Sequence, residues 1–308
     1  EGTYKSGGMP MPLAPALKAD YPEIEAAARI VSGRKSLIEY RGKYFDKLVM
    51  LTDPDFMQVF SFPLVTGNRK TVLQALSSIV LSENTAKAIF GTENPIGKSL
   101  KIGSEAHQKQ YIVTGILSEA PYNSTIQYDA IIRVENLSNY PSEKESWLNN
   151  SHSVFIKTAP EVTQATLENR LKSFIKKYYP GQIETLTKKG AKPDERGDLF
   201  ALRLQSLVKV HFDRDISGRG APIALIYVLM GIGFFILLIA CINFINLSIA
   251  RSFTRAKEMG VRKSLGALKK QLFIQIWSES TIICFVGFGV GFLLAFLLLP
   301  EFNAQFNA

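Results

Sequence analysis

The segment at residues 91–99 reads GTENPIGKS and ends like a phosphate-binding loop. A loop of that kind has four residues between its two glycines, follows a strand and opens a helix. Here five residues separate Gly91 from Gly97, and the segment follows a helix-like stretch and leads into the strand-like SLKI. We therefore interpret residues 91–99 as a turn and not as a nucleotide site.

The other side chains that could do chemistry lack the spacing that such chemistry requires. Metal ligands recur at short intervals, and a hydrolase nucleophile sits in a Gly-x-Ser-x-Gly elbow, which is absent here. The histidines are scattered and the close carboxylate pairs lie in turn-like tripeptides: His107, His152, His211, Asp53, Asp55, Asp213 and Asp215. We assign no catalytic residue and no metal site, and we expect a protein that is not an enzyme.

A basic connector near the C-terminal end carries the strongest functional signal. Between residues 251 and 270 there are seven basic residues and one acid: Arg251, Arg255, Lys257, Arg262, Lys263, Lys269, Lys270 and Glu258. Lys and Arg near the ends of membrane spans stay on the cytoplasmic side. The connector is therefore predicted to be cytoplasmic, with residues 1–220 and 301–308 outside.

Two charge-free stretches, residues 221–250 and 280–300, flank this connector. About 20 apolar residues span roughly 30 Å of hydrocarbon, so we predict transmembrane helices at 221–250 and 272–300, joined by a coupling segment at 251–271. A large external domain must be exported by something upstream, so we expect the sequence to be a fragment that lacks a preceding span. In the second helix, Gly287 and Gly291 form a small-xxx-small pattern, which predicts close helix packing.

Residues 1–220 have the composition of a soluble domain. Strands are expected at 47–52, 110–117, 128–134, 153–157 and 199–210, helices at 82–90 and 163–178, and loops at 140–151 and 180–197. Because few connections are long enough for parallel crossovers, the pattern predicts an α+β fold with a mostly antiparallel sheet. No basic run is interleaved with stacking aromatics, which argues against nucleic acid as a partner.

The connector itself is predicted to form a short helix set across the membrane plane. Gly260 permits a left-handed cap, residues 261–265 fit one helical turn, and Gly266 allows a second reversal of the chain. Such an element could be a basic hairpin held by anionic lipid, or a docking element for a cytoplasmic partner. The residues alone leave both interpretations open.

The sequence resembles a known family, the FtsX-like and MacB-like permeases of ATP-binding cassette (ABC) systems. Residues 246–280, NLSIARSFTRAKEMGVRKSLGALKKQLFIQIWSES, look like that family's second span, coupling segment and third span. DPDFMQVFSFPLVTGN at 53–68, GTENPIGKSL at 91–100 and TGILSEAPYNSTIQYD at 114–129 are similar to its periplasmic core domain, particularly in Bacteroidetes-type members. The resemblance covers nearly the whole chain.

The resemblance implies a non-catalytic permease subunit of the inner membrane, with a large domain in the periplasm. It would transmit ATP-driven motion from a cytoplasmic ABC ATPase, and ATP would be bound by that partner subunit. The residues that inherit the coupling role are Arg255, Lys257, Glu258, Gly260, Val261, Arg262, Lys263 and Gly266. A homodimer or pseudo-dimer, membrane lipid and a periplasmic or outer-membrane partner are also implied.

The sequence does not identify what the permease would transport or act on. Export of peptides, drugs or lipoproteins is ranked first, and regulation of a cell-wall hydrolase also occurs among relatives. The alternative from another class is a membrane-anchored sensor or binding protein that reads an external ligand. A sensor of this kind needs a cytoplasmic output domain. The connector, with only about 20 residues, is too short to form one.

Overall fold

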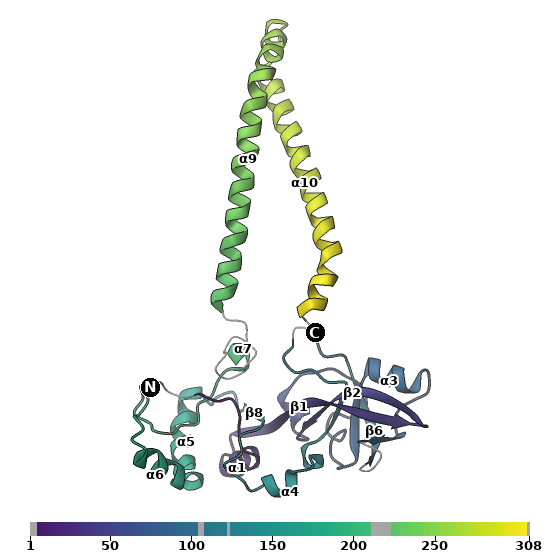
Figure 1. Cartoon of the computed structure of the whole chain (residues 1–308), viewed down its shortest axis with the longest axis vertical. Helices are drawn as coiled ribbons and strands as arrows, with labels where there is room; N and C mark the ends of the chain where they lie inside the picture. The colour runs from purple at the N-terminus through teal and green to yellow at the C-terminus, as the bar shows by residue number, and fades with distance from the viewer. Residues whose placement is uncertain (1–4, 104–107, 122–123, 211–222, 307–308) are drawn as a thin grey trace. The chain divides into compact units, whose positions relative to one another are not determined.

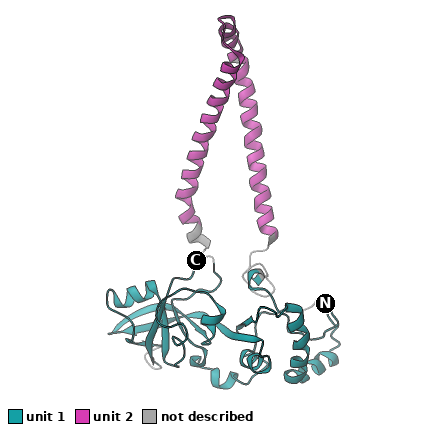
Figure 2. Ribbon diagram, turned by 180° about the vertical axis from the view of Figure 1, so that it is seen from behind, with its two compact units in different colours: residues 1–223 teal, residues 224–308 magenta. Residues whose placement is uncertain are grey.

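The computed structural model describes residues 5–103, 108–121, 124–210 and 223–306. The chain divides into two compact units, residues 1–223 and residues 224–308 (Figures 1 and 2). The first unit holds all the described strands and the second consists of two long helices. The residues named above as His107, His211, Asp213 and Asp215 lie outside the described ranges.

The first unit is built on one mixed sheet of eight strands. The strands are β1 (Ile24–Tyr40), β2 (Lys43–Thr52), β3 (Leu64–Thr66), β4 (Ser78–Ser82), β5 (Ser99–Ile102), β6 (Lys109–Leu117), β7 (Ala130–Arg133) and β8 (Ser153–Thr158). Their order is β2-β7-β4-β6-β5-β1-β8, with β3 on β6, and β1 also pairs with β2, so six of the strands close a ring. Among the described strand pairs only β2–β7 and β4–β6 are parallel, which confirms the mostly antiparallel α+β prediction.

Helices cover this sheet and extend beyond it. Those of the first unit are α1 (Leu13–Asp20), α2 (Phe56–Val59), α3 (Glu83–Phe90), α4 (Tyr140–Glu143), α5 (Gln164–Tyr178), α6 (Pro180–Lys188) and α7 (Leu207–Val210), with the 3-10 helix η2 (Val134–Asn136). In Figure 1, α5 and α6 lie side by side, apart from α3 and the strands β2 and β6. The caps at Ser82 and Thr163, whose side chains accept hydrogen bonds from the backbones of Thr85 and Thr166, explain where α3 and α5 begin.

Successive side chains of a strand point to opposite faces of the sheet, and each face has its own hydrophobic cluster. In β4, Ile79 and Leu81 pack with α3 in one cluster, whereas Val80 packs with α2 in the other. This is the period of two that a strand imposes on its side chains. A third cluster joins α1 and α5 through residues such as Leu17 and Phe174. The first unit therefore has a substantial core without any disulfide.

A buried ion pair fastens β1 to the end of β2. The guanidinium of Arg29 binds the carboxylate of Asp53 through two hydrogen bonds of 2.6 and 2.9 Å, and the Arg29 backbone N–H donates a third of 2.7 Å. Arg29 also donates to the carbonyl of Met11 at 3.0 Å. The DPD tripeptide is thus a turn, as its sequence predicts, and Asp53 is also the carboxylate that pairs with the buried Arg29.

His152 lies beside this pair with 4% of its surface exposed. Neither ring nitrogen has a hydrogen-bond partner among the described residues. Burial, followed by the positive charge of Arg29, lowers the pKa of His152 to about 4. The imidazole is therefore neutral at pH 7, and protonating it in place is unfavourable.

Three secondary-structure predictions are wrong or incomplete. The strand expected at 199–210 is absent: residues 207–210 form the helix α7, and residues 199–206 form no strand. In the latter stretch the Leu204 N–H is bonded at 3.0 Å to the Glu168 side chain instead of to a neighbouring strand. The expected loop at 180–197 begins with α6, for which Pro180 supplies a favourable first helical position. The expected loop at 140–151 includes the short helix α4.

The second unit contains α9 (Ile223–Ser264) and α10 (Lys269–Phe306). Each has a membrane-length apolar stretch, at residues 224–253 and 269–302, with mean hydropathies of 2.9 and 2.8. None of either apolar window is buried inside the protein, so these side chains are available to lipid. Two long apolar helices therefore follow the mixed sheet domain, as the sequence predicts.

Candidate functional site at the helical hairpin

The turn between α9 and α10 is closed by a left-handed glycine. Gly266 has φ of +91°, and its N–H bonds to the carbonyl of Lys263 at 3.1 Å while Ala267 N–H reaches the carbonyl of Arg262 at 3.0 Å. This pair of bonds is a Schellman motif, which satisfies carbonyls at a helix end. The reversal predicted at Gly266 is confirmed.

The start of α10 is capped from its own first turn. The Leu268 N–H donates to the side-chain oxygen of Gln271 at 3.2 Å, which is one half of a capping box. The chain thus needs only residues 265–268 to reverse direction. A turn this short holds the ends of the two helices at a defined spacing.

The helix break predicted at Gly260 is wrong. α9 continues through Gly260 to Ser264, so no separate short helix lies between the two spans. Gly260 does not have a positive φ, and a Cβ built on it would meet nothing within 4 Å. A helix tolerates one glycine at about 1 kcal/mol relative to Ala, and no cap is required there.

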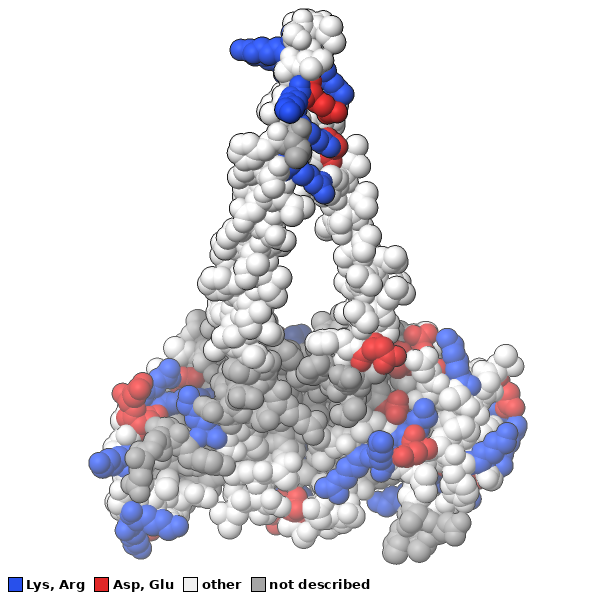
Figure 3. Space-filling model, turned by 45° about the horizontal axis from the view of Figure 1, so that its top comes forward, with Lys and Arg blue, Asp and Glu red and all other residues white. Residues whose placement is uncertain are grey.

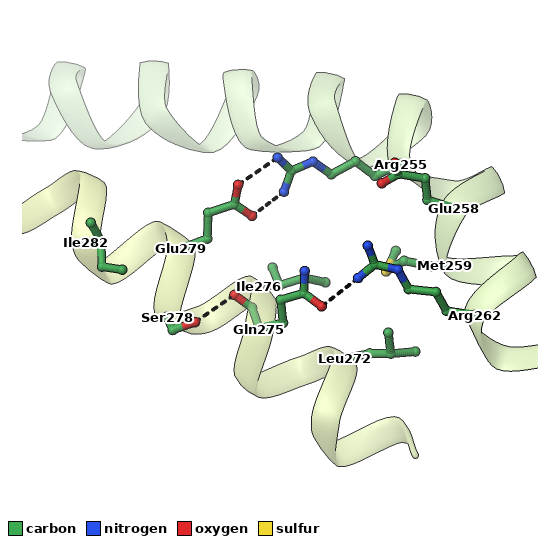
Figure 4. A pocket seen from close by; sticks show the side chains of 10 residues that line it. All are labelled: Arg255, Glu258, Met259, Arg262, Leu272, Gln275, Ile276, Ser278, Glu279 and Ile282. Atoms are coloured by element: carbon green, nitrogen blue, oxygen red, sulfur yellow. Dashed lines mark hydrogen bonds and ion pairs between the residues drawn. The ribbon is translucent and has the colours of Figure 1, made fainter. Parts of the chain in front are cut away.

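Two polar contacts cross-link the helices on the span side of the turn (Figure 4). The guanidinium of Arg255 makes a two-pronged ion pair with the carboxylate of Glu279, one prong of which measures 2.7 Å. A second contact lies closer to the turn, where Arg262 Nη1 donates a hydrogen bond to Gln275 Oε1 at 2.8 Å. The hydrogen bonds that Arg255 donates to the Glu279 carboxylate raise the pKa of Arg255, so this arginine stays charged.

A half-open cavity of about 330 Å³ lies between these contacts. Its wall on α9 includes Glu258 and Met259, and its wall on α10 includes Leu272 and Ile276. Figure 4 shows the apolar side chains Met259 and Ile276 between the two cross-links. The cavity therefore combines charged groups with an apolar surface.

The remaining predicted coupling residues form the outer surface of the hairpin end. Lys257 and Lys263 are exposed, and Val261 is 59% exposed. In Figure 3, Lys and Arg side chains gather near the turn, while adjoining stretches of both helices carry no charge on the visible face. The structure thus places all eight predicted residues within the last turns of α9 and the reversal, but their coupling role stays a prediction.

Gly287 and Gly291 lie within α10, away from the turn. A Cβ at either position would meet nothing within 4 Å in the described part of the chain. The side of α10 that bears them is thus open with respect to the residues that the structure describes. Close packing there against another helix stays a prediction.

The sequence reasoning missed two residues of the site, Glu279 and Gln275. Glu279 is the only charged residue between Lys270 and Glu301, and an ionisable group in such a stretch requires a partner. Arg255 and Glu279 lie 11 residues before and 13 residues after Gly266, so a hairpin with its turn there brings them level. Counting residues outward from Gly266 in the sequence is therefore sufficient to identify the pair.

Comparison with known proteins identifies the class. Residues 2–174 match the family model described as MacB-like periplasmic core domain, and residues 230–308 match the model described as FtsX-like permease C-terminal. These two domains place the chain among ABC transporter permeases. It belongs to the family defined by the MacB-like periplasmic core domain, carried here together with the FtsX-like domain.

Relatives with names are also ATP-binding/permease proteins, and their sequence identity to this chain is low. The macrolide export ATP-binding/permease protein MacB of Aggregatibacter actinomycetemcomitans is 25% identical over 227 residues, covering 72% of this chain and 30% of that protein. The pyoverdine export ATP-binding/permease protein PvdT of Pseudomonas aeruginosa is 23% identical over 321 residues, covering 99% of this chain and 44% of that protein. The chain spans less than half the length of these relatives.

A solved structure supports the fold of the first unit. A domain from a Porphyromonas gingivalis protein described as a permease superposes with a TM-score of 0.50 and 22% identity. The match covers 56% of this chain and 78% of that chain. At this identity the comparison speaks to the fold alone.

Proposed function

We propose that this chain is the membrane part of an ABC exporter that transmits ATP-driven motion from a cytoplasmic ATPase to the sheet domain, which lies in the periplasm. The ATPase engages the basic turn between α9 and α10. ATP is bound and hydrolysed by the ATPase and not by this chain. The ATPase is a separate subunit in this proposal, although the names of the relatives combine ATP-binding and permease activities in one protein.

The observation that carries the proposal is the rigid attachment of the basic turn to both spans. α9 is continuous for 42 residues, which corresponds to about 60 Å at 1.5 Å per residue. The Arg255–Glu279 and Arg262–Gln275 contacts connect α10 to the end of this continuous helix. A displacement of the turn therefore moves both helices together instead of being absorbed by a hinge at Gly260.

The charge of the turn supports its location on the cytoplasmic side of the inner membrane. Seven basic residues and one acid lie between positions 251 and 270, and retention of such segments in the cytoplasm is a general rule. The protein crosses the membrane more than once, and the open face around Gly287 and Gly291 supports packing of a second permease copy. A periplasmic or outer-membrane partner would complete the export route.

The exported substrate is proposed only as a class. The named relatives export macrolides or pyoverdine, and peptides, drugs and lipoproteins are the candidate classes for this chain. Within the described residues, no group of three or more His, Cys, Asp or Glu could hold a metal ion. Transmission of motion to the periplasmic domain needs no such site.

Membrane sidedness is tested by cysteine labelling in intact cells. The two native cysteines, Cys241 and Cys284, are first replaced by Ala, and single cysteines are then placed at the exposed positions Ser142 and Ser264. A maleimide that does not cross the inner membrane should modify Ser142→Cys and leave Ser264→Cys unmodified until the cells are lysed. The reverse pattern would overturn the proposed topology.

Coupling is tested in the full-length protein by vanadate-sensitive ATP hydrolysis and by retention of the ATPase during purification. Arg262→Glu and Lys269→Glu change the charge of the turn by the same amount from its two sides. Docking at the end of α9 predicts a larger loss of retention for Arg262→Glu, whereas a purely electrostatic lipid anchor predicts equal effects that depend on anionic lipid. Unchanged retention and hydrolysis in both variants would refute the proposal.

A further inference from the structure

Residues 8–12, just before α1, form a strap that lies against the buried His152. Met9 pairs with His152 in an isolated antiparallel bridge, in which the Met9 N–H donates to the His152 carbonyl at 2.6 Å. The Met11 side chain is buried and belongs to the same hydrophobic cluster as Ile79 and Leu81 of β4. The strap therefore helps to enclose both the imidazole and part of the core.

The strap is attached to the sheet by few hydrogen bonds. Pro10 and Pro12 have no N–H, so only Met9 and Met11 can donate from the backbone between residues 9 and 12. Apart from the Met9 bond, the strap accepts a bond of 3.0 Å from Arg29 at the Met11 carbonyl. The helix α1 has buried side chains of its own in the third cluster. The strap can therefore open at Pro12 while α1 stays packed.

The charged groups around the imidazole are already paired with one another. The Asp53 carboxylate is bound by Arg29, and the ring of Tyr140 in α4 lies 5.6 Å from the same guanidinium. Residues 8–12 carry no charge. The carboxylates of the neighbouring elements are engaged as well: Asp55 by Lys18, Glu135 by Arg133, and Glu143 by Asn139 and Asn149.

A proton on His152 is therefore opposed while the strap is closed. Burial and the positive charge of Arg29 act against the charged ring, and Asp53 and the Pro10 carbonyl favour it less strongly. Neither ring nitrogen makes a hydrogen bond of ordinary geometry with the described residues. Opening the strap gives the ring access to water, which removes the cost of burying its charge.

We propose that uptake of a proton by His152 releases the strap, so that residues 8–12 act as a cover that opens in mild acid. Release takes Met11 out of the core and frees a donor group of Arg29. The opening involves only contacts inside the sheet domain, so it does not depend on coupling to an ATPase. On the outer side of the membrane, where the proposed topology places this domain, the pH of the surroundings acts on the strap directly.

Amide hydrogen exchange at Met9 measures the opening in the full chain in detergent, because this N–H is bonded to His152 only while the strap is closed. The pKa of His152 is about 4 in the closed state and 6.5 when the ring is in water, so the open state takes up the proton first. The opening equilibrium should therefore rise about 30-fold from pH 7.5 to pH 5. The protection of Met9, corrected for the pH dependence of chemical exchange, should fall by the same factor.

Urea separates opening of the strap from unfolding of the whole domain. A local opening exposes little surface, so exchange through it is nearly independent of low urea concentrations, whereas exchange through global unfolding is not. The strand β4, in which every residue is buried, provides the global reference. We expect Met9 to exchange faster than β4 and without urea dependence. Equal protection and equal urea dependence at both places would overturn the proposal.

Two variants test the part played by His152. His152→Gln has no titrating ring, so the protection of Met9 should be nearly the same at pH 7.5 and pH 5. Gly8→Ala disfavours the closed strap without changing the ring, because a Cβ there would lie 2.6 Å from the Asn150 carbonyl oxygen. It should lower the protection of Met9 at both pH values and move the titration of His152 towards 6.5, while β4 stays protected. A 30-fold fall that persists in His152→Gln, or a parent chain whose Met9 protection ignores pH, would show that His152 does not control the strap.

Discussion

The buried imidazole of His152 makes the stability of the sheet domain sensitive to mild acid. In the folded chain its pKa is lowered from the ordinary 6.5 to about 4, first by burial and then by the charge of Arg29. Because this folded-state pKa is depressed for a base, the unfolded chain takes up a proton before the folded chain does. Stability should therefore be complete above pH 6.5 and should fall as the pH drops from 6.5 towards 4.

The size of the effect follows from the two pKa values. Each pH unit between them corresponds to about 1.4 kcal/mol, so the full window is worth about 3 kcal/mol and the step from pH 7.5 to pH 5 about 2 kcal/mol. Carboxylates such as Glu135 and Glu168, whose pKa values are lowered, act in the same direction but at lower pH. The stability that they contribute is lost only as the pH falls below their ordinary value of 4.5, so their effect overlaps little with that of His152 between pH 7.5 and pH 5.

The assay is urea unfolding of the chain in detergent, followed by the fluorescence of Trp147 in a Trp277→Phe background. Trp147 stacks on Tyr178 at 4.6 Å between ring centroids and reports the core that joins α1 and α5. The midpoint should fall between pH 7.5 and pH 5 in the parent chain. The matched variant His152→Gln removes the titrating group, so its midpoint should change much less over the same interval.

An equal loss of unfolding free energy in the parent and in His152→Gln between pH 7.5 and pH 5 would show that His152 does not cause the pH dependence. Direct titration gives an independent check. Replacing His107 and His211 by Gln leaves His152 as the only histidine, and its ring proton resonances should move only below pH 5. A titration midpoint near 6.5 would show that Arg29 and burial do not act on the ring as argued.

Local patterns in the sequence were sufficient for the elements whose physics is local. Ser82 and Thr163 mark helix starts because each side chain bonds a backbone N–H three residues later, which spacing alone reveals. Leu167 and Leu171 fall on one helical face and are buried. The two apolar helices were equally readable, since their length and lack of charge are visible in the sequence.

Features that depend on distant pairing were not predictable in this way. β1 is 17 residues long and pairs with β2, β5 and β8, and only this long-range pairing closes the ring. The burial of Asp53 follows from Arg29, 24 residues earlier in the chain. Residues 199–206 have the apolar content of a strand, but their packing against α5 and the bond to Glu168 determine their conformation.

The candidate site was predicted in part. The identity and location of the basic turn follow from charge counting, and the reversal at Gly266 follows from glycine at a helix end. The continuity of α9 through Gly260 was not predicted, because a glycine allows a helix to end but does not require it to end. The contact between Arg255 and Glu279 needed the register of the hairpin, which the position of the turn supplies.

Three further predictions concern the helical hairpin and the buried carboxylate of Glu168. Exchanging the charges in Arg255→Glu with Glu279→Arg should restore the cross-link that either single change breaks, as measured by the distance between spin labels on the two helices. Glu168→Gln should destabilise the sheet domain by about 1–3 kcal/mol in urea unfolding, because it removes the charge that Arg196 binds at 2.7 Å. The sharpest contrast is between the two glycines of the turn. Gly266→Ala forces a side chain into φ of +91° and should cost about 1–2 kcal/mol, whereas Gly260→Ala replaces a helical glycine with open space around its Cβ and should stabilise α9 by up to about 1 kcal/mol. Thermal unfolding by circular dichroism in detergent measures both, and a loss in Gly260→Ala as large as that in Gly266→Ala would show that α9 breaks at Gly260 after all.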